Sequence, residues 1–170
     1  MRHTFSLIAG LSGALPGMAA LLLASAASAE PQDNTRAQVE IARAGTQAAV
    51  SGPAAYFTGQ VKVEPLWPNN EQINVSGAYV TFEAGARSAW HVHPSGQRLV
   101  VVSGEGLTQE WGKPIQKIHP GDVVWCPPGV RHWHGAAPNT KMTHLAVTGM
   151  ADGKGVKWLE KVSDEQYSGR

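Results

Sequence analysis

Short apolar segments separated by glycine, proline and asparagine fill the chain from Tyr56 onward. Within them, β-branched and aromatic residues recur on alternate positions, which is typical of strands that bury one face. Nine strands are predicted, at residues 59–63, 73–82, 88–93, 98–102, 106–111, 115–119, 122–126, 131–135 and 142–148. Short, evenly spaced strands with turn residues between them indicate an all-β sandwich or barrel and not βαβ units.

A different pattern occupies residues 1–29. Arg2 precedes a mostly apolar run over 5–23, and the segment ends in the small residues Ala27-Ser28-Ala29. A basic start, an apolar middle and a small-residue cleavage site predict a secretory signal peptide that is cut before Glu30. A membrane anchor is the alternative, but glycines and a proline interrupt the apolar run. We therefore expect a periplasmic or secreted protein with no membrane partner after cleavage.

Changes in composition divide the rest of the chain into three segments. Residues 30–55 are expected to form a short helix over 35–44, where good helix formers cluster, followed by a Gly/Ser/Ala linker. Residues 56–150 hold the predicted barrel. Residues 151–170 form a polar tail with three apolar side chains that can pack back onto the barrel, namely Val156, Trp158 and Leu159.

The charge balance limits the partners. The 170 residues carry 14 basic and 13 acidic side chains, which leaves 13 of each once Arg2 is removed. A neutral chain without a basic cluster has no electrostatic basis for binding nucleic acid. Cys126 is the single cysteine, so no internal disulfide can form, and its apolar neighbours favour a buried small side chain over a ligand or nucleophile. His119 and Arg87 are expected in solvated turns, although Arg87 could also steer anions.

The clearest chemistry lies in the stretch GARSAWHVHPSGQRLVVVSG, residues 85–104. His91 and His93 are two apart in a predicted strand, so their imidazoles project from one face. Gln97 follows a Pro-Ser-Gly turn, and His132 follows a later Pro/Gly turn. Three imidazoles and an amide oxygen can hold one divalent ion, so these four residues are predicted to form a metal site inside a small β-barrel. The alternative is a set of hydrogen-bonded core histidines.

The donor set restricts the metal and its chemistry. Imidazole and amide ligands suit Mn, Fe, Co, Ni, Cu or Zn, and the absence of thiolate ligands argues against a structural Zn or Fe–S centre. Four protein ligands leave open positions on an ion that prefers six, as in a catalytic site. Because Gln97 is neutral, a divalent ion would keep its full formal charge, which attracts anions and lowers the pKa of a bound hydroxyl.

Strand parity places a second set of residues near this site. His144 shares a strand face with Met142, Ala146 and Thr148, and residues 76–82 present a second face formed by Ala78, Val80 and Phe82. If both faces point inward, His144 is a titratable group in an apolar cup and can exchange a proton near neutral pH. A neutral imidazole bound to a backbone carbonyl is the alternative. His134 also has inward parity and is expected to orient the site or to join the catalysis.

The spacing of these residues matches a known pattern. G-x5-H-x-H-x3-Q-x6-G from Gly85 to Gly104, followed by G-x5-P-x-G-x2-H from Gly121 to His132, resembles the two signature motifs of the cupin superfamily. The resemblance implies a cupin-type jelly-roll barrel, here with a short N-terminal helix, and an ion in its mouth bound by His91, His93, Gln97 and His132. Two positions depart from the family: Gln97 replaces the usual glutamate, and Ala136 replaces the usual asparagine.

The same runs are similar to small bacterial manganese-dependent cupins with hydroxynitrile lyase activity. This similarity implies a metal-dependent carbon–carbon lyase that reversibly cleaves an α-hydroxynitrile of the mandelonitrile type into an aldehyde and HCN. It implies Mn as the metal, with Fe, Zn, Co or Ni as alternatives, and His144 as the catalytic histidine, with His134 as the second candidate. Thr148 stands where the family commonly has glutamine. With the parity argument, the predicted substrate pocket comprises Ala78, Val80, Phe82, Met142 and Thr148.

Two other functions are compatible with the same residues. An Fe- or Mn-dependent dioxygenase or related oxidoreductase would bind a chelating enolate beside O₂ at the open positions. The carboxylate ligand that such oxygenases often carry is missing. A periplasmic module that binds a metal or small anion without chemistry is the third possibility, because one barrel serves many purposes. Apolar exterior strand faces and the N-terminal extension favour a homodimer or homotetramer.

Overall fold

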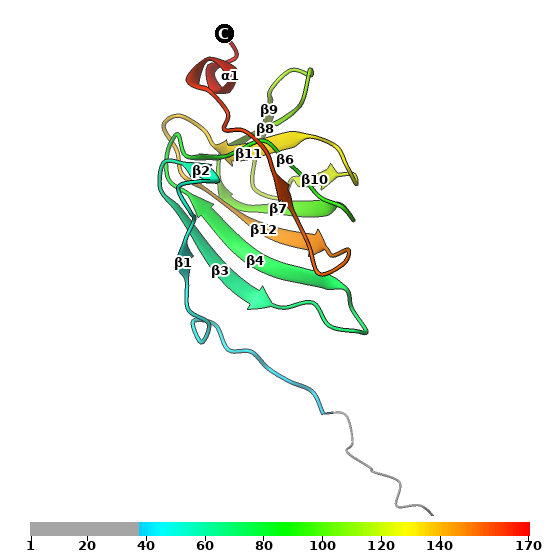
Figure 1. The fold of residues 1–170 in the computed structure, drawn as a ribbon. Coiled ribbons are helices and arrows are strands. Elements are labelled where there is room, and N and C mark those ends of the chain that lie inside the picture. The colour runs from blue at the N-terminus through cyan, green and yellow to red at the C-terminus, as the bar shows by residue number, and fades with distance from the viewer. Residues whose placement is uncertain (1–37) are drawn as a thin grey trace, which may run out of the picture. The chain divides into compact units, whose positions relative to one another are not determined.

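Two curled antiparallel sheets build the barrel in the computed structural model, which describes residues 38–170 (Figure 1). One sheet has the order β1 (Val50–Ser51), β3 (Val61–Trp67), β4 (Val75–Phe82), β12 (Met142–Gly149), β7 (Gln97–Gly104) and β10 (Val123–Cys126). The other has the order β13 (Lys157–Trp158), β6 (His91–Val92), β11 (His132–Ala136), β5 (Arg87–Ser88) and β2 (Phe57–Thr58). In this second sheet β8 (Gly106–Glu110) pairs with β11 and with β9 (Gln116–Ile118).

The strand predictions are confirmed, and the fold is nearly all-β as expected. Each predicted strand has an observed counterpart in the same part of the chain, with bounds that differ by a few residues. The single helix among the described residues is α1 (Asp164–Ser168), near the C-terminus. No helix within residues 38–170 is long and apolar enough to cross a bilayer. The predicted signal peptide lies outside the described residues.

The predicted N-terminal helix is wrong for the part that the structure describes. Residues 38–44 contain no helical turn, and residues 35–37 are not described. Val39 and Ile41, which were expected to give this helix an apolar side, are 91% and 64% exposed. A ten-residue helix without a packed face is marginal in water, because nucleation is costly and few hydrogen bonds follow. Part of the expected linker instead forms β1, which pairs with β3.

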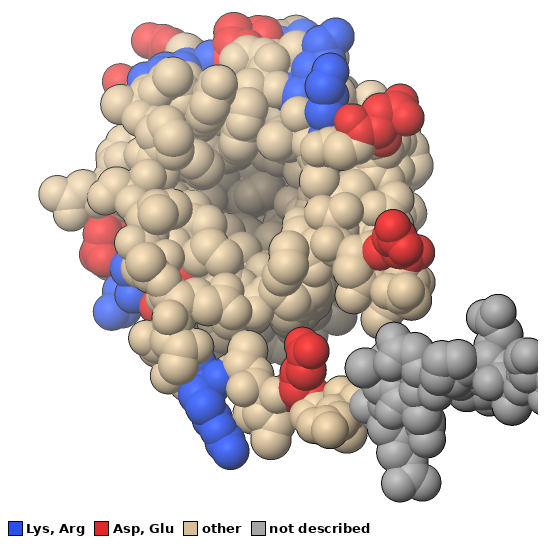
Figure 2. Space-filling view, turned by 60° about the horizontal axis from the view of Figure 1, so that its bottom comes forward, with Lys and Arg blue, Asp and Glu red and all other residues tan. Residues whose placement is uncertain are grey.

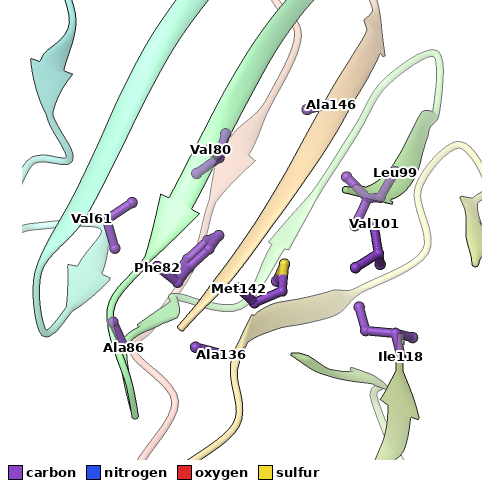
Figure 3. Packing of buried hydrophobic residues seen from close by; sticks show 10 residues of the cluster. All are labelled: Val61, Val80, Phe82, Ala86, Leu99, Val101, Ile118, Ala136, Met142 and Ala146. Atoms are coloured by element: carbon purple, nitrogen blue, oxygen red, sulfur yellow. The ribbon is translucent and has the colours of Figure 1, made fainter. Parts of the chain in front are cut away.

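The core lies between the two sheets (Figure 3). Alternate side chains of the long strands point inward, as the burial of Met142, His144 and Ala146 on β12 shows. Phe82 and Met142 are fully buried and lie opposite each other across the β4–β12 pair. The cluster is completed by Val61, Val80, Ala86, Leu99, Val101, Ile118, Ala136 and Ala146. Hydrophobic burial on this scale holds the strand ends that carry the polar site.

The C-terminal tail packs on the barrel, as predicted. It does so partly through Arg87, for which the prediction of a solvated turn is wrong. Arg87 is buried and not in a solvated turn. Its guanidinium donates to the Val162 carbonyl from Nε (3.2 Å) and Nη2 (3.1 Å), and to Asp164 at 2.6 Å. It also lies 4.7 Å from the centre of the Tyr167 ring. These contacts tie α1 and the residues just before it to β5. We call residues 151–163, which run across the barrel before α1, the C-terminal strap.

Replacement of Arg87 by methionine is expected to lower the free energy of unfolding by about 2 kcal/mol, because the buried Val162 carbonyl then loses its charged donor. Urea denaturation measures this change. The control is Asp164→Asn, which should cost much less because the Asp164 side chain is 91% exposed. Equal losses in the two variants would contradict the structural role given to the buried guanidinium.

Candidate metal centre and substrate cavity

Three histidines from two adjacent strands meet at one point. His91 lies on β6, His93 follows that strand directly, and His132 begins β11. The β6–β11 pairing places His132 opposite His91, with ring centres 4.3 Å apart. One nitrogen from each of the three side chains lies within 4.8 Å of the others, and all three side chains are buried. The predicted convergence of the imidazoles is present in the structure.

Hydrogen bonds select the tautomer of each ring. Nδ1 of His91 contacts the Ala89 carbonyl at 2.9 Å, and Nδ1 of His132 contacts the Val130 carbonyl at 2.9 Å. Nδ1 of His93 contacts the carbonyl of Gly155 at 2.5 Å. Because a carbonyl oxygen only accepts, each Nδ1 carries the proton and each Nε2 keeps a lone pair. This is the tautomer in which Nε2 can ligate a metal.

Gln97 adds a fourth candidate donor, since it lines one cavity together with His91 and His93. It begins β7, and its amide nitrogen donates to the Thr148 hydroxyl at 2.8 Å. That bond leaves the amide oxygen free, and this oxygen is buried with no hydrogen-bond partner among the described residues. The Nε2 atoms of His93 and His132 are buried and without a partner in the same way. Burial of unpaired acceptors is costly, so the cluster fits the metal site of this type of barrel.

Burial keeps the histidines neutral. Desolvation lowers the pKa of His132 to about 4 and lowers the pKa of His93. Desolvation, with repulsion from His132 and His93, holds the pKa of His91 well below its usual range. Neutral imidazoles are the form that binds metal, so the site needs no deprotonation at neutral pH.

Acid should therefore destabilise the metal-free protein. A histidine whose pKa is lower in the folded state binds fewer protons there than in the unfolded chain, so stability rises with pH between the two pKa values. Five buried histidines share this direction, and for His132 and His144 the window runs from about 6.5 down to about 4. Urea midpoints of chelator-treated protein should be level above pH 7 and fall steeply toward pH 4.5. A flat profile across that range would contradict the neutral cluster.

His134 and His144 lie beside the three imidazoles and extend the cluster. Their ring centres are 4.9 Å apart, and the His134 ring centre is 5.1 Å from that of His91. Desolvation lowers the pKa of His144 to about 4 and, with repulsion from His144 and His91, holds the pKa of His134 well below its usual range. Nδ1 of His134 and both ring nitrogens of His144 have no hydrogen-bond partner among residues 38–170. Within these residues no ring nitrogen of His144 makes a hydrogen bond of normal geometry to a backbone carbonyl, which favours a free ring over the carbonyl-bound alternative.

A cavity of about 520 Å³ opens from these histidines to the surface. Figure 2 shows the hollow at its mouth, rimmed by residues other than lysine, arginine, aspartate and glutamate. The predicted pocket residues Ala78, Val80 and Thr148 line it, together with His91, His93, Gln97, His134 and His144. Phe82 and Met142 do not line it. They lie in the core beneath, with the Phe82 ring centre 5.7 Å from that of His144.

Sequence reasoning missed the wall that faces the small residues. Tyr56, Phe57 and Trp158 line the cavity, and so does Gly155. The Trp158 ring stacks on Tyr56 at 4.8 Å between centres and meets Phe57 edge-on at 5.4 Å. Apolar residues in the tail were the available signal, but they predict only that the tail packs somewhere.

The prediction for Cys126 is confirmed, since it is buried and burial raises the pKa of its thiol to about 12. His119 is exposed, as expected.

Comparisons with known proteins agree with this geometry. The family model of the cupin domain matches residues 78–148. The (R)-mandelonitrile lyase of Granulicella tundricola is 56% identical over 129 residues, which cover 76% of this chain and 98% of that protein. A solved cupin-like protein from Thermotoga maritima is 39% identical, with a TM-score of 0.66 over 77% of this chain and 96% of that one.

A more distant structure supports the fold alone. The cupin 2 conserved barrel domain protein from Rhodopseudomonas palustris is 20% identical, with a TM-score of 0.57 over 66% of this chain and 77% of that one. The relative that is more than half identical carries much more weight, because this chain spans nearly its whole length. That degree of similarity, together with the match of the cupin family model to residues 78–148, shows that the chain belongs to the cupin family.

Proposed function

We propose that this cupin is a divalent-metal-dependent hydroxynitrile lyase that reversibly cleaves α-hydroxynitriles of the mandelonitrile type into an aldehyde and HCN. The observation that carries the proposal is His144, a neutral imidazole with two unpartnered nitrogens, which lines the same uncharged cavity as the histidine cluster. The name of the Granulicella relative, (R)-mandelonitrile lyase, supports the same reaction. Manganese is the metal we expect from the resemblance to the manganese-dependent cupins, while the imidazole and amide donor set also suits Fe, Co, Ni or Zn.

Four side chains would hold the metal. His91, His93 and His132 would ligate through Nε2, and Gln97 through the amide oxygen that its bond to Thr148 leaves free. A divalent ion there would supply Lewis acidity, which lowers the pKa of a substrate hydroxyl and stabilises negative charge on its oxygen. The neutral amide matters for this chemistry, because a glutamate in its place would cancel one unit of positive charge.

His144 would move the proton. Its lowered pKa keeps the ring neutral at pH 7, so one nitrogen bears a proton and the other can accept one. In the cleavage direction the ring takes the hydroxyl proton as the carbon–carbon bond to cyanide breaks and the carbonyl forms. The ring then gives this proton to cyanide, which leaves as HCN, and His144 is neutral again. In the reverse direction, the ring takes the proton from HCN and returns it to the new hydroxyl.

The cavity walls would hold the organic part of the substrate. Ala78, Val80 and Ala146 form a small-residue wall, and Phe57 and Trp158 are aromatic residues that line the same cavity. An apolar cavity of this size accepts a phenyl group, and its walls exclude water from the proton-transfer region. His134 donates no proton in this scheme. It lies between the His91 and His144 rings and would keep both in place.

The test is mandelonitrile cleavage by protein purified without chelator, with benzaldehyde followed by its absorbance and the bound metal identified by elemental analysis. Removal of the metal should abolish turnover, and Mn²⁺ should restore it. A protein that binds Mn²⁺ and forms no benzaldehyde would contradict the proposal. Oxygen uptake with a diketone or flavonol would instead support an oxidoreductase. Export and self-association into a dimer or tetramer remain predictions, which fractionation of cells and light scattering can test.

A further inference from the structure

The C-terminal strap runs along one edge of β6, the strand that carries His91 and ends next to His93. β13 within the strap pairs with β6, which places Trp158 opposite His91 and Lys157 opposite Val92. Two more backbone hydrogen bonds join the strap to Trp90. Leu159 N–H donates to the Trp90 carbonyl at 2.8 Å, and Trp90 N–H donates to the Glu160 carbonyl at 2.9 Å. β6 has only two residues, and its neighbours are β11 on one side and the strap on the other. The strap is therefore one of the two backbone neighbours of β6.

His93 depends on the strap in a way that the other two histidines do not. The carbonyls that bind Nδ1 of His91 and His132 lie two residues earlier in the chain, so each ring is oriented by its own segment. The carbonyl that binds His93 belongs to Gly155, 62 residues away. His93 itself lies just beyond the end of β6 and is in no strand. Its ring orientation is thus a tertiary feature, decided by where the strap lies.

Trp158 is the side chain that fixes the strap at this point. It stacks on Tyr56 with an interplanar angle of 10°, meets Phe57 edge-on and has its ring centre 5.0 Å from that of His91. Aromatic contacts of this kind stabilise a structure beyond the area that they bury. Only two residues lie between Gly155 and Trp158, so we expect loosening of the indole to loosen the Gly155 carbonyl as well.

Gly155 packs closely on the side chains of Met150 and Thr148. A Cβ added there would lie 2.8 Å from Sδ of Met150 and 3.1 Å from the methyl carbon of Thr148. Thr148 is the residue whose hydroxyl orients Gln97. One glycine therefore contacts the supports of two different metal-site residues, His93 through its carbonyl and Gln97 through the close packing on Thr148.

We propose that the strap is a positioning element of the metal centre, in which the Gly155 carbonyl sets the ring of His93 and Trp158 clamps that carbonyl in place. The inference deepens the proposed metal site and does not depend on which reaction the site performs. Loss of a group that orients a ligand typically weakens metal binding by about 10–100-fold. Metal affinity should therefore depend on Trp158, although Trp158 offers the metal no donor atom.

The experiment compares Trp158→Ala, Trp158→Phe and the parent protein by competition for Mn²⁺ with a chelator, and by the visible spectrum of the Co²⁺-loaded protein. We expect about 10–100-fold weaker Mn²⁺ binding and altered Co²⁺ bands in Trp158→Ala. Phenylalanine can keep the aromatic contacts, so Trp158→Phe should bind within about threefold of the parent. The matched control is Trp67→Ala, since Trp67 is a half-exposed tryptophan on β3 in the other sheet.

Parent-like Mn²⁺ affinity and Co²⁺ bands in Trp158→Ala would overturn the proposal, as would an equal loss of affinity in Trp67→Ala or no recovery in Trp158→Phe. Should Trp158→Ala not fold, Gly155→Ala provides the second variant, because its methyl group would lie 2.8 Å from Sδ of Met150 and 3.1 Å from the methyl carbon of Thr148 and is expected to displace the Gly155 carbonyl. Parent-like binding in Gly155→Ala would then overturn the proposal. Failure of the proposed lyase reaction is distinguishable, because both readouts use the metal alone.

Discussion

Replacing His144 by alanine is expected to reduce kcat for mandelonitrile cleavage by about 10²–10⁴-fold, the usual range for loss of a general acid–base group. Bound Mn²⁺ should stay at parent level, because no ligand is removed. The loss of kcat is expected because the His144 ring is fully buried, neutral at pH 7 and without a hydrogen-bond partner within residues 38–170. Steady-state kinetics with elemental analysis of the same sample measures both quantities.

Two further histidine variants make the result specific. His119→Ala is the control, because His119 is exposed and its ring lies beside the surface carboxylates of Glu105 and Asp122. It should keep parent kcat. His134→Ala should lower metal affinity as well as turnover if His134 orients the cluster, and turnover alone if it transfers the proton. Full activity in His144→Ala would remove that residue from the mechanism.

Replacing Gln97 by glutamate is expected to tighten Mn²⁺ binding by about 100-fold and to slow cleavage by a similar factor, because a carboxylate ligand binds a divalent ion more strongly and cancels one unit of its charge. The Thr148 hydroxyl, which accepts from the Gln97 amide, can turn and donate to a carboxylate. The variant should therefore fold. Chelator competition gives the affinity, and the kinetics give the rate.

Thr148→Val is the companion variant for this experiment. It keeps the shape of the side chain and removes the hydroxyl that holds the Gln97 amide nitrogen at 2.8 Å. Binding should weaken in this variant, opposite to the effect of Gln97→Glu, because the amide oxygen is no longer oriented. Faster cleavage in Gln97→Glu would contradict the view that the neutral amide favours acidification of the hydroxyl.

Local pattern was enough to predict most of the barrel and the convergence of the three imidazoles. Residues two apart in a strand share a face, so His91 with His93, and His144 with Ala146, could be placed without coordinates. The burial of Val80, His144 and Ala146, and the place of Ala78 in the cavity lining, confirm that both faces point inward. The same reasoning was wrong for Phe82 and Met142, which share those faces but lie in the core below the cavity. Parity predicts the side of the sheet on which a residue lies, and not its distance from the barrel mouth.

Long-range contacts account for the other differences. Arg87 looked like a solvated turn residue, since nothing near it in the chain reveals that the Val162 carbonyl will lie within hydrogen-bonding distance. The predicted helix over 35–44 rested on propensity, which a segment with exposed Val39 and Ile41 does not convert into a stable helix. Trp158 and Gly155 belong to a tail whose composition is polar, and their place beside His91 and His93 depends on pairing across the second sheet.

The sequence by itself determined the strand pattern, the cupin motifs and the identity of the side chains that meet at the site, because these follow from periodicity and spacing along a short stretch of chain. Only the tertiary structure decided how those side chains are held. The tautomer of His93, the free oxygen of Gln97 and the aromatic wall each depend on a contact with a residue more than 30 positions away. Hydrogen bonding and packing act between neighbours in space, and a linear pattern contains no record of which distant segments become neighbours.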